Sequence, residues 1–269
     1  MNDIVTIPVT SPHMIAEIDG SIGWLTFNKP ERRNAVSLDM WEAMPEILHR
    51  FESDPAVRVI VLKGAGDRAF VSGADISQFE TARSSEAGNA HYDRVSECAG
   101  KALAECSKPT IAMIRGYCIG GGLAIAIGCD IRIATDDSKF GIPASRLGVG
   151  YGAVGVKKLV GLVGPSFTKE IFFTARHFTA SEALTMGLVN RVVPPAELED
   201  YTRTYCATIA DNAPMTMNTL KRTVAEVLRG HEADWELCDR LVKECFASQD
   251  YTEGRRAFME KRRAVFRGI

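Results

Sequence analysis

The sequence predicts an α/β fold followed by a helical C-terminal region. Short apolar, β-rich runs alternate with Gly-rich or polar loops and with helical periodicity through the first ~190 residues. After Pro194-Pro195 the composition changes: residues 196–266 contain long helical patterns, no strand candidate and a single proline. The chain has 269 residues, 46% of them hydrophobic, which is enough for one large buried core. We therefore predict a core over residues 1–200 and a helical region over residues 201–269.

The elements follow from local patterns. Residues 14–29 alternate in short β-rich stretches around an Asp19-Gly20-Ser21 turn, which indicates an antiparallel hairpin. Residues 37–51 have apolar side chains at helical spacing, with Ser37 placed to cap the helix and Pro45 placed to shift its start or bend it. Three apolar runs predict buried strands, at residues 57–63, 110–114 and 131–134. Two further segments predict helices. Residues 84–105 are predicted to form a loop followed by a helix, and residues 251–266 to form a single helix.

Composition excludes several classes of protein. The 32 Lys and Arg residues nearly balance the 34 Asp and Glu residues, and no basic stripe occurs, so we expect no nucleic-acid partner. The seven cysteines form no CxxC pair and lie mostly in apolar runs, which predicts reduced thiols in the core and a cytoplasmic location. No signal peptide and no run of about 18 apolar residues occurs, so we expect no membrane association. The histidines are scattered, and we expect no metal site.

Two loops contain residues suited to chemistry: residues 69–76 (AFVSGADI) and residues 116–130 (GYCIGGGLAIAIGCD). In the second loop, three glycines precede an apolar helix, so unshielded N–H groups lie at the positive end of a helix. Such an end can hold an anion or a developing oxyanion, although the glycines could equally serve only close packing against a strand. A P-loop is excluded because Gly-Lys-Ser/Thr is missing, and no Gly-x-Gly-x-x-Gly opens the run.

These two loops and four further blocks resemble the crotonase family, also called the enoyl-CoA hydratase/isomerase family, over nearly the whole chain. The resemblance implies a crotonase-like superhelix of ββα units with a C-terminal helical trimerisation region, assembled as a homotrimer or a dimer of trimers. It also implies an acyl-CoA thioester substrate, with coenzyme A as part of the substrate and no separate cofactor. The blocks are Leu25–Pro30 with Asn34-Ala35, Ala69–Ile76, Gly116–Asp130, Phe140–Pro143, Ala180–Asn190, and Glu253-Gly254 with Ala257–Arg263.

The resemblance also implies a site. The backbone N–H groups of Ala74 and Gly121 would hold the thioester oxygen, with Gly120 beside them, and fixed donors of this kind stabilise an enolate. The coenzyme A moiety would lie around Arg32, Arg33 and the loop of Ser72, and would meet Phe258 and Lys261 of a neighbouring subunit.

The chain departs from the family pattern at both carboxylates of a hydratase. The two glutamate positions map onto Ala124 and Ala144, which would contact substrate but cannot transfer a proton, so we expect poor hydration. Tyr151 is the first candidate for a proton donor, or else an aromatic pocket lining. His91 is a second candidate, or else an exposed helix residue. Arg146 could pair with a substrate carboxylate or form a surface salt bridge.

These residues predict an acyl-CoA enzyme that stabilises a thioester enolate. The reactions that suit such a site without glutamates are decarboxylation of a malonyl-type thioester and double-bond isomerisation with another base. A hypothesis of another class is a non-catalytic subunit that binds acyl-CoA.

Overall fold

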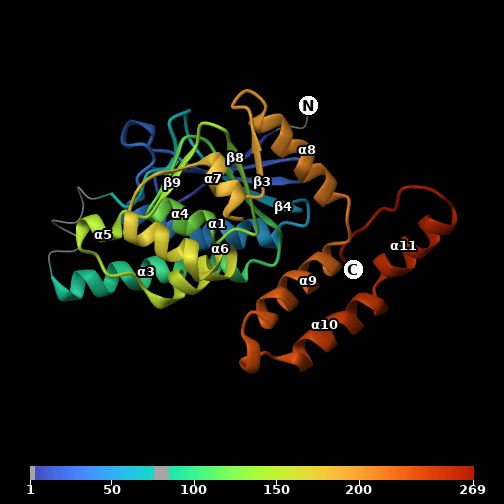
Figure 1. Ribbon diagram of the computed structural model, residues 1–269. Coiled ribbons are helices and arrows are strands. Elements are labelled where there is room, and N and C mark those ends of the chain that lie inside the picture. Colours follow the sequence, from blue (N-terminus) through green and yellow to red (C-terminus); the bar gives the residue numbers. More distant parts are fainter. Residues whose placement is uncertain (1–3, 76–84) are drawn as a thin grey trace.

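The computed structural model describes residues 4–75 and 85–269, and Figure 1 shows an α/β body from which the C-terminal helices project. In these ranges a seven-stranded sheet has the order β1-β2-β3-β4-β6-β8-β11, and a four-stranded sheet has the order β10-β9-β7-β5. The large sheet comprises β1 (Val5–Ile7), β2 (Met14–Asp19), β3 (Ile22–Phe27), β4 (Val59–Gly64), β6 (Thr110–Ile114), β8 (Ile131–Thr135) and β11 (Arg191–Val193). The small sheet comprises β5 (Ala69–Val71), β7 (Tyr117–Ile119), β9 (Lys139–Gly141) and β10 (Phe178–Thr179).

The predicted hairpin and the predicted buried strands are confirmed. β2 and β3 pair antiparallel around Gly20, whose φ of 59° suits a glycine in a tight turn. From β3 to β11 the neighbouring strands of the large sheet are parallel. Their runs are mainly apolar because both faces are buried: Ile60 and Leu62 of β4 enter one core cluster, whereas Val59 and Val61 enter the other.

Helices bury both faces of the large sheet. The first core cluster lies between the two sheets and the helices α1 (Leu38–Ser53), α3 (Glu86–Glu105), α4 (Gly121–Ala126), α6 (Ala153–Thr174) and α7 (Ala180–Thr185), and the short α5 (Ala144–Leu147) packs on α6. The second cluster lies under α8 (Leu198–Ala210), which contributes Leu198 and Cys206. The division at residue 200 therefore falls inside a helix that packs on the sheet.

The helix α1 runs through Pro45 and begins at Leu38, directly after Ser37. Of the two alternatives predicted for Pro45, a shift of the helix start is therefore wrong, and a bend stays a prediction. A proline inside a helix removes the hydrogen bond to the carbonyl four residues earlier, here that of Trp41. The buried stripe compensates for this loss, because seven side chains of α1 pack into the first core cluster.

Three helices form the projecting C-terminal region: α9 (Pro214–Val227), α10 (Trp235–Ala247) and α11 (Gln249–Met259). The helix that we predict over residues 251–266 ends earlier, at Met259. The chain then folds back, and the Glu253 carboxylate accepts hydrogen bonds from the Arg262 guanidinium (2.6 Å) and from the Val265 amide (3.1 Å). These contacts replace the last predicted turns.

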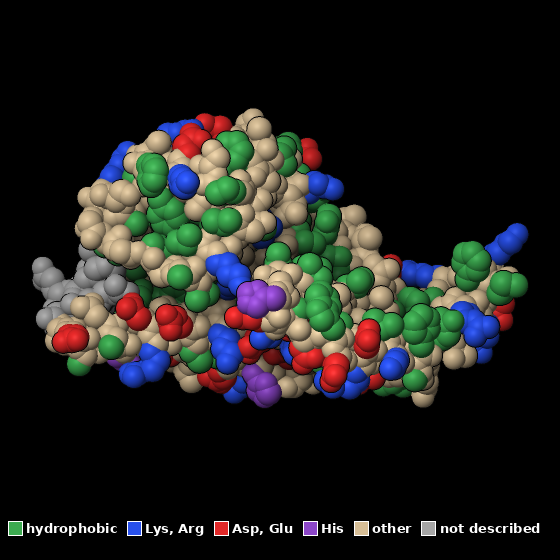
Figure 2. Space-filling view, turned by 60° about the horizontal axis from the view of Figure 1, so that its bottom comes forward, with side chains coloured by type: hydrophobic (Ala, Val, Ile, Leu, Met, Phe, Trp, Pro, Cys, Tyr) green, Lys and Arg blue, Asp and Glu red, His purple; other side chains and the backbone are tan. Residues whose placement is uncertain are grey.

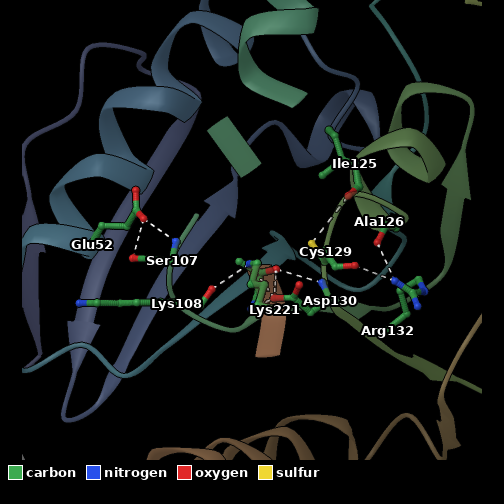
Figure 3. A network of polar contacts seen from close by, with 10 residues as sticks. Glu52, Ser107, Lys108, Ile125, Ala126, Cys129, Asp130, Arg132 and Lys221 are labelled. Carbon is green, nitrogen blue, oxygen red and sulfur yellow. Dashed lines mark hydrogen bonds and ion pairs between the residues drawn. The ribbon is translucent and has the colours of Figure 1, made fainter. Parts of the chain in front are cut away.

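A polar network joins this region to the core (Figure 3). Lys221 of α9 donates to the Lys108 carbonyl at 3.0 Å and to Asp130 Oδ2 at 2.8 Å. The same carboxylate oxygen accepts from the Thr110 amide (2.7 Å) and hydroxyl (2.8 Å). Asp130 therefore has a structural role, since it connects α9 to the segment that follows α4.

The cysteines differ in how far they are buried. All seven are free thiols, and Cys106, Cys118, Cys129, Cys206 and Cys238 are buried as predicted, whereas Cys98 on α3 is exposed. No helix within residues 4–75 and 85–269 is long and apolar enough to cross a bilayer.

Candidate active site

Three neighbouring parallel strands of the small sheet end at one edge, and the candidate site lies there. β5 pairs with β7, and β7 pairs with β9, in each case in parallel. The loops that follow these strands therefore leave the sheet side by side. Ala74 lies in the loop after β5, Gly121 and Ala124 lie on α4 after β7, and Ala144 begins α5 after β9. The topology thus brings together four predicted site residues that lie up to 70 positions apart in the sequence.

The loop that carries Ala74 is held on both sides. The Val36 amide donates to the Gly73 carbonyl (2.8 Å), and the Asp75 amide donates to the Val36 carbonyl (2.9 Å). The buried Asp75 carboxylate also pairs with Lys29 Nζ at 2.7 Å, which gives this aspartate a structural role. These contacts fix the peptide plane of Ala74 before any ligand arrives.

The Ala74 and Gly121 backbones lie close together. A Cβ atom built on Gly121 would lie 3.5 Å from the Ala74 nitrogen and 3.7 Å from Trp41 Cζ2. Neither amide donates a hydrogen bond to an acceptor within the described ranges. Two unengaged amides at the end of a short helix and on a fixed loop suit an oxygen atom that gains negative charge.

The three successive glycines, Gly120, Gly121 and Gly122, differ in what the structure requires at each position. Gly120 has φ 54° and ψ −115°, a conformation that other residues rarely adopt. Gly121 has room around it, since the nearest atoms to an added Cβ lie at 3.5 Å or more. Gly122 packs against β5, where an added Cβ would lie 2.1 Å from the Val71 carbonyl oxygen. The close-packing interpretation therefore holds for Gly122 and leaves Gly121 for another role.

Hydrogen bonds at both ends fix α4, the helix that begins at Gly121. The Gly120 amide donates to the Gly141 carbonyl at 2.8 Å, which joins the start of α4 to β9. At the other end the buried Arg132 guanidinium donates to the Cys129 carbonyl (2.8 Å) and the Ala126 carbonyl (3.5 Å), as Figure 3 shows. A cation at the C-terminal end of a helix also interacts favourably with the helix dipole.

Cationic side chains lie beside the same loop. Arg32 and Arg33 are exposed, and the Arg33 guanidinium lies over the Tyr117 ring, 5.3 Å from its centroid. The Ser72 hydroxyl donates to the Arg32 carbonyl at 3.4 Å, and the Ser72 amide donates to the Arg33 carbonyl at 3.1 Å. The structure therefore places Arg32, Arg33 and Ser72 next to the Ala74 loop.

Tyr151 lies between α5 and α6 and packs on the first core cluster, as Ala74 also does. Its ring meets Phe172 edge to face, with the centroids 4.9 Å apart. Burial raises the pKa of the Tyr151 phenol to about 12, so the phenol stays protonated at neutral pH. Such a group can donate a proton but is a poor base. The nearby Arg146 is exposed and forms no ion pair with a described residue.

His91 lies on the protein surface. It is an exposed residue of α3, with its Nε2 atom 3.8 Å from Glu42 and its Nδ1 atom 3.3 Å from Arg94. Its neighbour Tyr92 is buried instead and accepts a hydrogen bond from Trp41 Nε1 at 2.9 Å. Sequence reasoning missed Trp41 and Tyr92, because each looks like an ordinary core position in a helical stripe.

Phe258 and Lys261 lie at the end of α11, which is remote from α4 on the same chain (Figure 1). Phe258 is 82% exposed. These residues could reach a site of this kind only on another copy of the chain. No group of three or more His, Cys, Asp or Glu residues in the described part of the chain could hold a metal ion.

Comparison with known proteins shows the family of the chain. Residues 17–268 match the enoyl-CoA hydratase/isomerase family. The chain is 34% identical to a short-chain-enoyl-CoA hydratase of Clostridium acetobutylicum (93% of this chain, 96% of the relative). It is 33% identical to a crotonyl-CoA hydratase of Syntrophomonas wolfei (94% and 97%).

Solved structures give the same result. A crystal structure of an enoyl-CoA hydratase/carnithine racemase from Magnetospirillum magneticum has a TM-score of 0.91 and 32% identity over 97% of each chain. A putative enoyl-CoA hydratase/isomerase family protein from Hyphomonas neptunium has a TM-score of 0.91 and 36% identity over 94% of this chain and 97% of that one. The fold is therefore the crotonase fold, and the chain belongs to the enoyl-CoA hydratase/isomerase family.

Proposed function

We propose that this protein is an acyl-CoA enzyme that polarises a thioester carbonyl between the Ala74 and Gly121 amides and thereby stabilises an enolate. The observation that supports the proposal is a pair of neighbouring amides without a hydrogen-bond acceptor in the described residues, one on a fixed loop and one at a fixed helix end. Preorganised donors of this kind need no reorganisation when charge develops, which makes them effective in catalysis. Arg32, Arg33 and Ser72 would bind the coenzyme A moiety, since guanidinium groups suit phosphates.

The reaction that we propose is decarboxylation of a malonyl-type thioester. The bond between the α-carbon and the carboxylate carbon breaks, CO₂ leaves, and the electron pair passes into the thioester as an enolate. A donor then delivers a proton to the α-carbon. No protein base is needed for the first step, which suits a site with alanine at positions 124 and 144. We propose Tyr151 as the donor, because its phenol keeps its proton at neutral pH.

Double-bond isomerisation is the second candidate. It requires a base that removes a proton from the substrate before the enolate forms. The raised pKa of Tyr151 argues against this residue as the base. Simple hydration is disfavoured for the same reason, since the hydratase reaction also needs a group that activates water.

A panel of substrates tests these reactions. Purified protein is incubated with methylmalonyl-CoA, a 3-enoyl-CoA and crotonyl-CoA, and the products are followed by mass spectrometry. We expect loss of CO₂ from methylmalonyl-CoA and little conversion of crotonyl-CoA. Rapid hydration of crotonyl-CoA alone would contradict the proposed reaction. Tight binding of every thioester without any product would favour the alternative, a non-catalytic acyl-CoA-binding subunit.

We also propose that the chain assembles as a homotrimer or a dimer of trimers through its C-terminal helices. Hydrophobic side chains are exposed along these helices (Figure 2), among them Leu220, Phe246 and Met259. A groove of about 870 Å³ lies between α9, α10 and α11 and has a mainly apolar lining. Exposed apolar side chains gathered around one groove favour association.

Replacing Phe258 tests whether the assembly completes the site. This side chain is 82% exposed on its own chain, so Phe258→Ala should leave the isolated fold intact. If Phe258 reaches a neighbour's site, coenzyme A should bind more weakly in calorimetry, by about tenfold. Leu228→Ala is a control, since it also removes an exposed apolar side chain of the helical region. Equal affinities in both variants would contradict the contact between subunits.

A further inference from the structure

Trp41 lies against the site described above and has no role in the proposed chemistry. Its Cζ2 atom is 3.7 Å from the place where a Cβ on Gly121 would be, and that place is 3.5 Å from the Ala74 nitrogen. The indole edge is therefore in van der Waals range of the space beside the two amides. An indole offers only carbon there, so it would meet an apolar part of a ligand rather than a phosphate.

The indole is held in place from the opposite helix. Trp41 belongs to α1 and Tyr92 to α3, and the Trp41 Nε1–H group donates to Tyr92 Oη at 2.9 Å. The two residues are only 6% and 5% exposed. Turning the indole away would leave a buried N–H group without its acceptor, which is unfavourable. Both residues also pack into the first core cluster with Leu123 and Ala144, so neighbouring side chains resist such a movement.

We propose that Trp41, oriented by Tyr92, is the specificity-determining wall of the acyl pocket and restricts this protein to short acyl chains. The inference rests on the proposed function, because it assumes that a thioester carbonyl lies between Ala74 and Gly121. A short acyl group ends before the indole. A longer chain must displace a buried, hydrogen-bonded side chain and therefore loses the affinity that its extra methylenes would bring.

Binding of a series of saturated thioesters, which are not turned over, tests whether Trp41 limits the length of the acyl chain. Dissociation constants are measured by calorimetry for butyryl-, hexanoyl-, octanoyl- and decanoyl-CoA. Wild-type protein should prefer the shorter chains. Trp41→Ala should raise the affinity for octanoyl-CoA relative to butyryl-CoA by at least about tenfold, because each newly buried methylene is worth about fourfold and the octanoyl chain has four more of them. Tyr92→Phe keeps the ring and removes the acceptor, so it should shift the preference in the same direction by a smaller factor.

Phe51→Ala is the matched control. Phe51 is fully buried on the same helix, ten residues after Trp41, and packs against Gly23 of β3. Ten residues correspond to roughly 15 Å along a helix. This variant should lose stability, yet its order of chain-length preference should equal that of the wild type.

Fluorescence gives a second readout that does not depend on the alanine variant folding. The other two tryptophans are elsewhere: Trp24 lies in the second core cluster, and Trp235 is 55% exposed on α10. Butyryl-CoA should therefore change the emission of the wild type but not that of Trp41→Phe. An unchanged chain-length profile in Trp41→Ala, or an unchanged fluorescence response in Trp41→Phe, would contradict the proposal that Trp41 limits the length of the acyl chain. Failure of every thioester to bind the wild type would instead contradict the proposed function.

Discussion

Ala74 and Gly121 would act through main-chain atoms. Their residue types therefore matter only through the backbone conformation that they allow. Gly121 is the first residue of α4, and its φ is not positive. The first helical position tolerates proline well, because the N–H group there has no partner inside the helix. A proline at this position therefore removes one proposed donor with little disturbance of the helix.

Gly121→Pro should lower kcat by about 10²–10³, the usual cost of losing one oxyanion donor. The measurement is steady-state turnover of the substrate that the panel identifies. Thermal denaturation of the same variant is the control, and it should show a melting temperature close to that of the wild type. A folded variant with unchanged kcat would show that the Gly121 amide does not take part in the reaction.

The alanines at positions 124 and 144 allow a gain-of-function experiment. Ala124 is half-buried and Ala144 is buried, each on a short helix that follows a strand of the small sheet. The double variant Ala124→Glu with Ala144→Glu supplies two titratable groups, and crotonyl-CoA hydration should rise by at least about 10², the lower end of general acid–base catalysis. The two single variants are the controls, and each should gain less than the pair. No gain in the folded double variant would indicate that the acyl group lies elsewhere.

At the scale of elements, one ion pair attaches the helical region to the core. The Lys221 side chain is 14% exposed and that of Asp130 is 32% exposed, so water screens the pair only in part. The lysine also donates to the Lys108 carbonyl, and Lys108 in turn donates to the Phe51 carbonyl at 2.6 Å, at the end of α1. The contact thus connects α9 to the segments around both α1 and α4.

Lys221→Met should destabilise the protein by about 1–3 kcal/mol, the cost of losing hydrogen bonds to a charged group that stays partly buried. Urea denaturation followed by circular dichroism measures this change. Lys101→Met is the matched control, because its pair with Glu105 has side chains that are 71% and 60% exposed. Exposed pairs of this kind contribute about 0–1 kcal/mol. Equal midpoints for the two variants would show that Lys221 does not attach the region.

At the scale of the whole molecule, buried thiols make stability depend on alkaline pH. Burial raises the pKa of Cys106 to about 11 and those of Cys129 and Cys206 to about 12. The thiols of the unfolded chain ionise near pH 9, whereas those of the folded chain keep their protons. The unfolded state then binds fewer protons, so stability should fall as pH rises from about 9 toward 11–12.

Each such thiol contributes a slope of about 1.4 kcal/mol per pH unit in that window. Urea unfolding at several pH values above 8, under reducing conditions, measures the total slope. Cys129→Ala should make the slope shallower, whereas the exposed Cys98→Ala should leave it unchanged. Equal slopes in the two variants would contradict the assignment to buried thiols.

The sequence by itself determined the hairpin at residues 14–29, the buried strands, the glycine-rich helix start and the alanines at positions 124 and 144. These features follow from residue type, periodicity and turn chemistry over a few positions, and they need no knowledge of distant contacts. Only the tertiary structure decided that α8 packs with the core, that His91 faces Glu42, and that Trp41 lies beside Gly121. The physical reason is that α1, α3 and the ends of three parallel strands meet through packing, and no local pattern in the chain specifies which of their side chains come together.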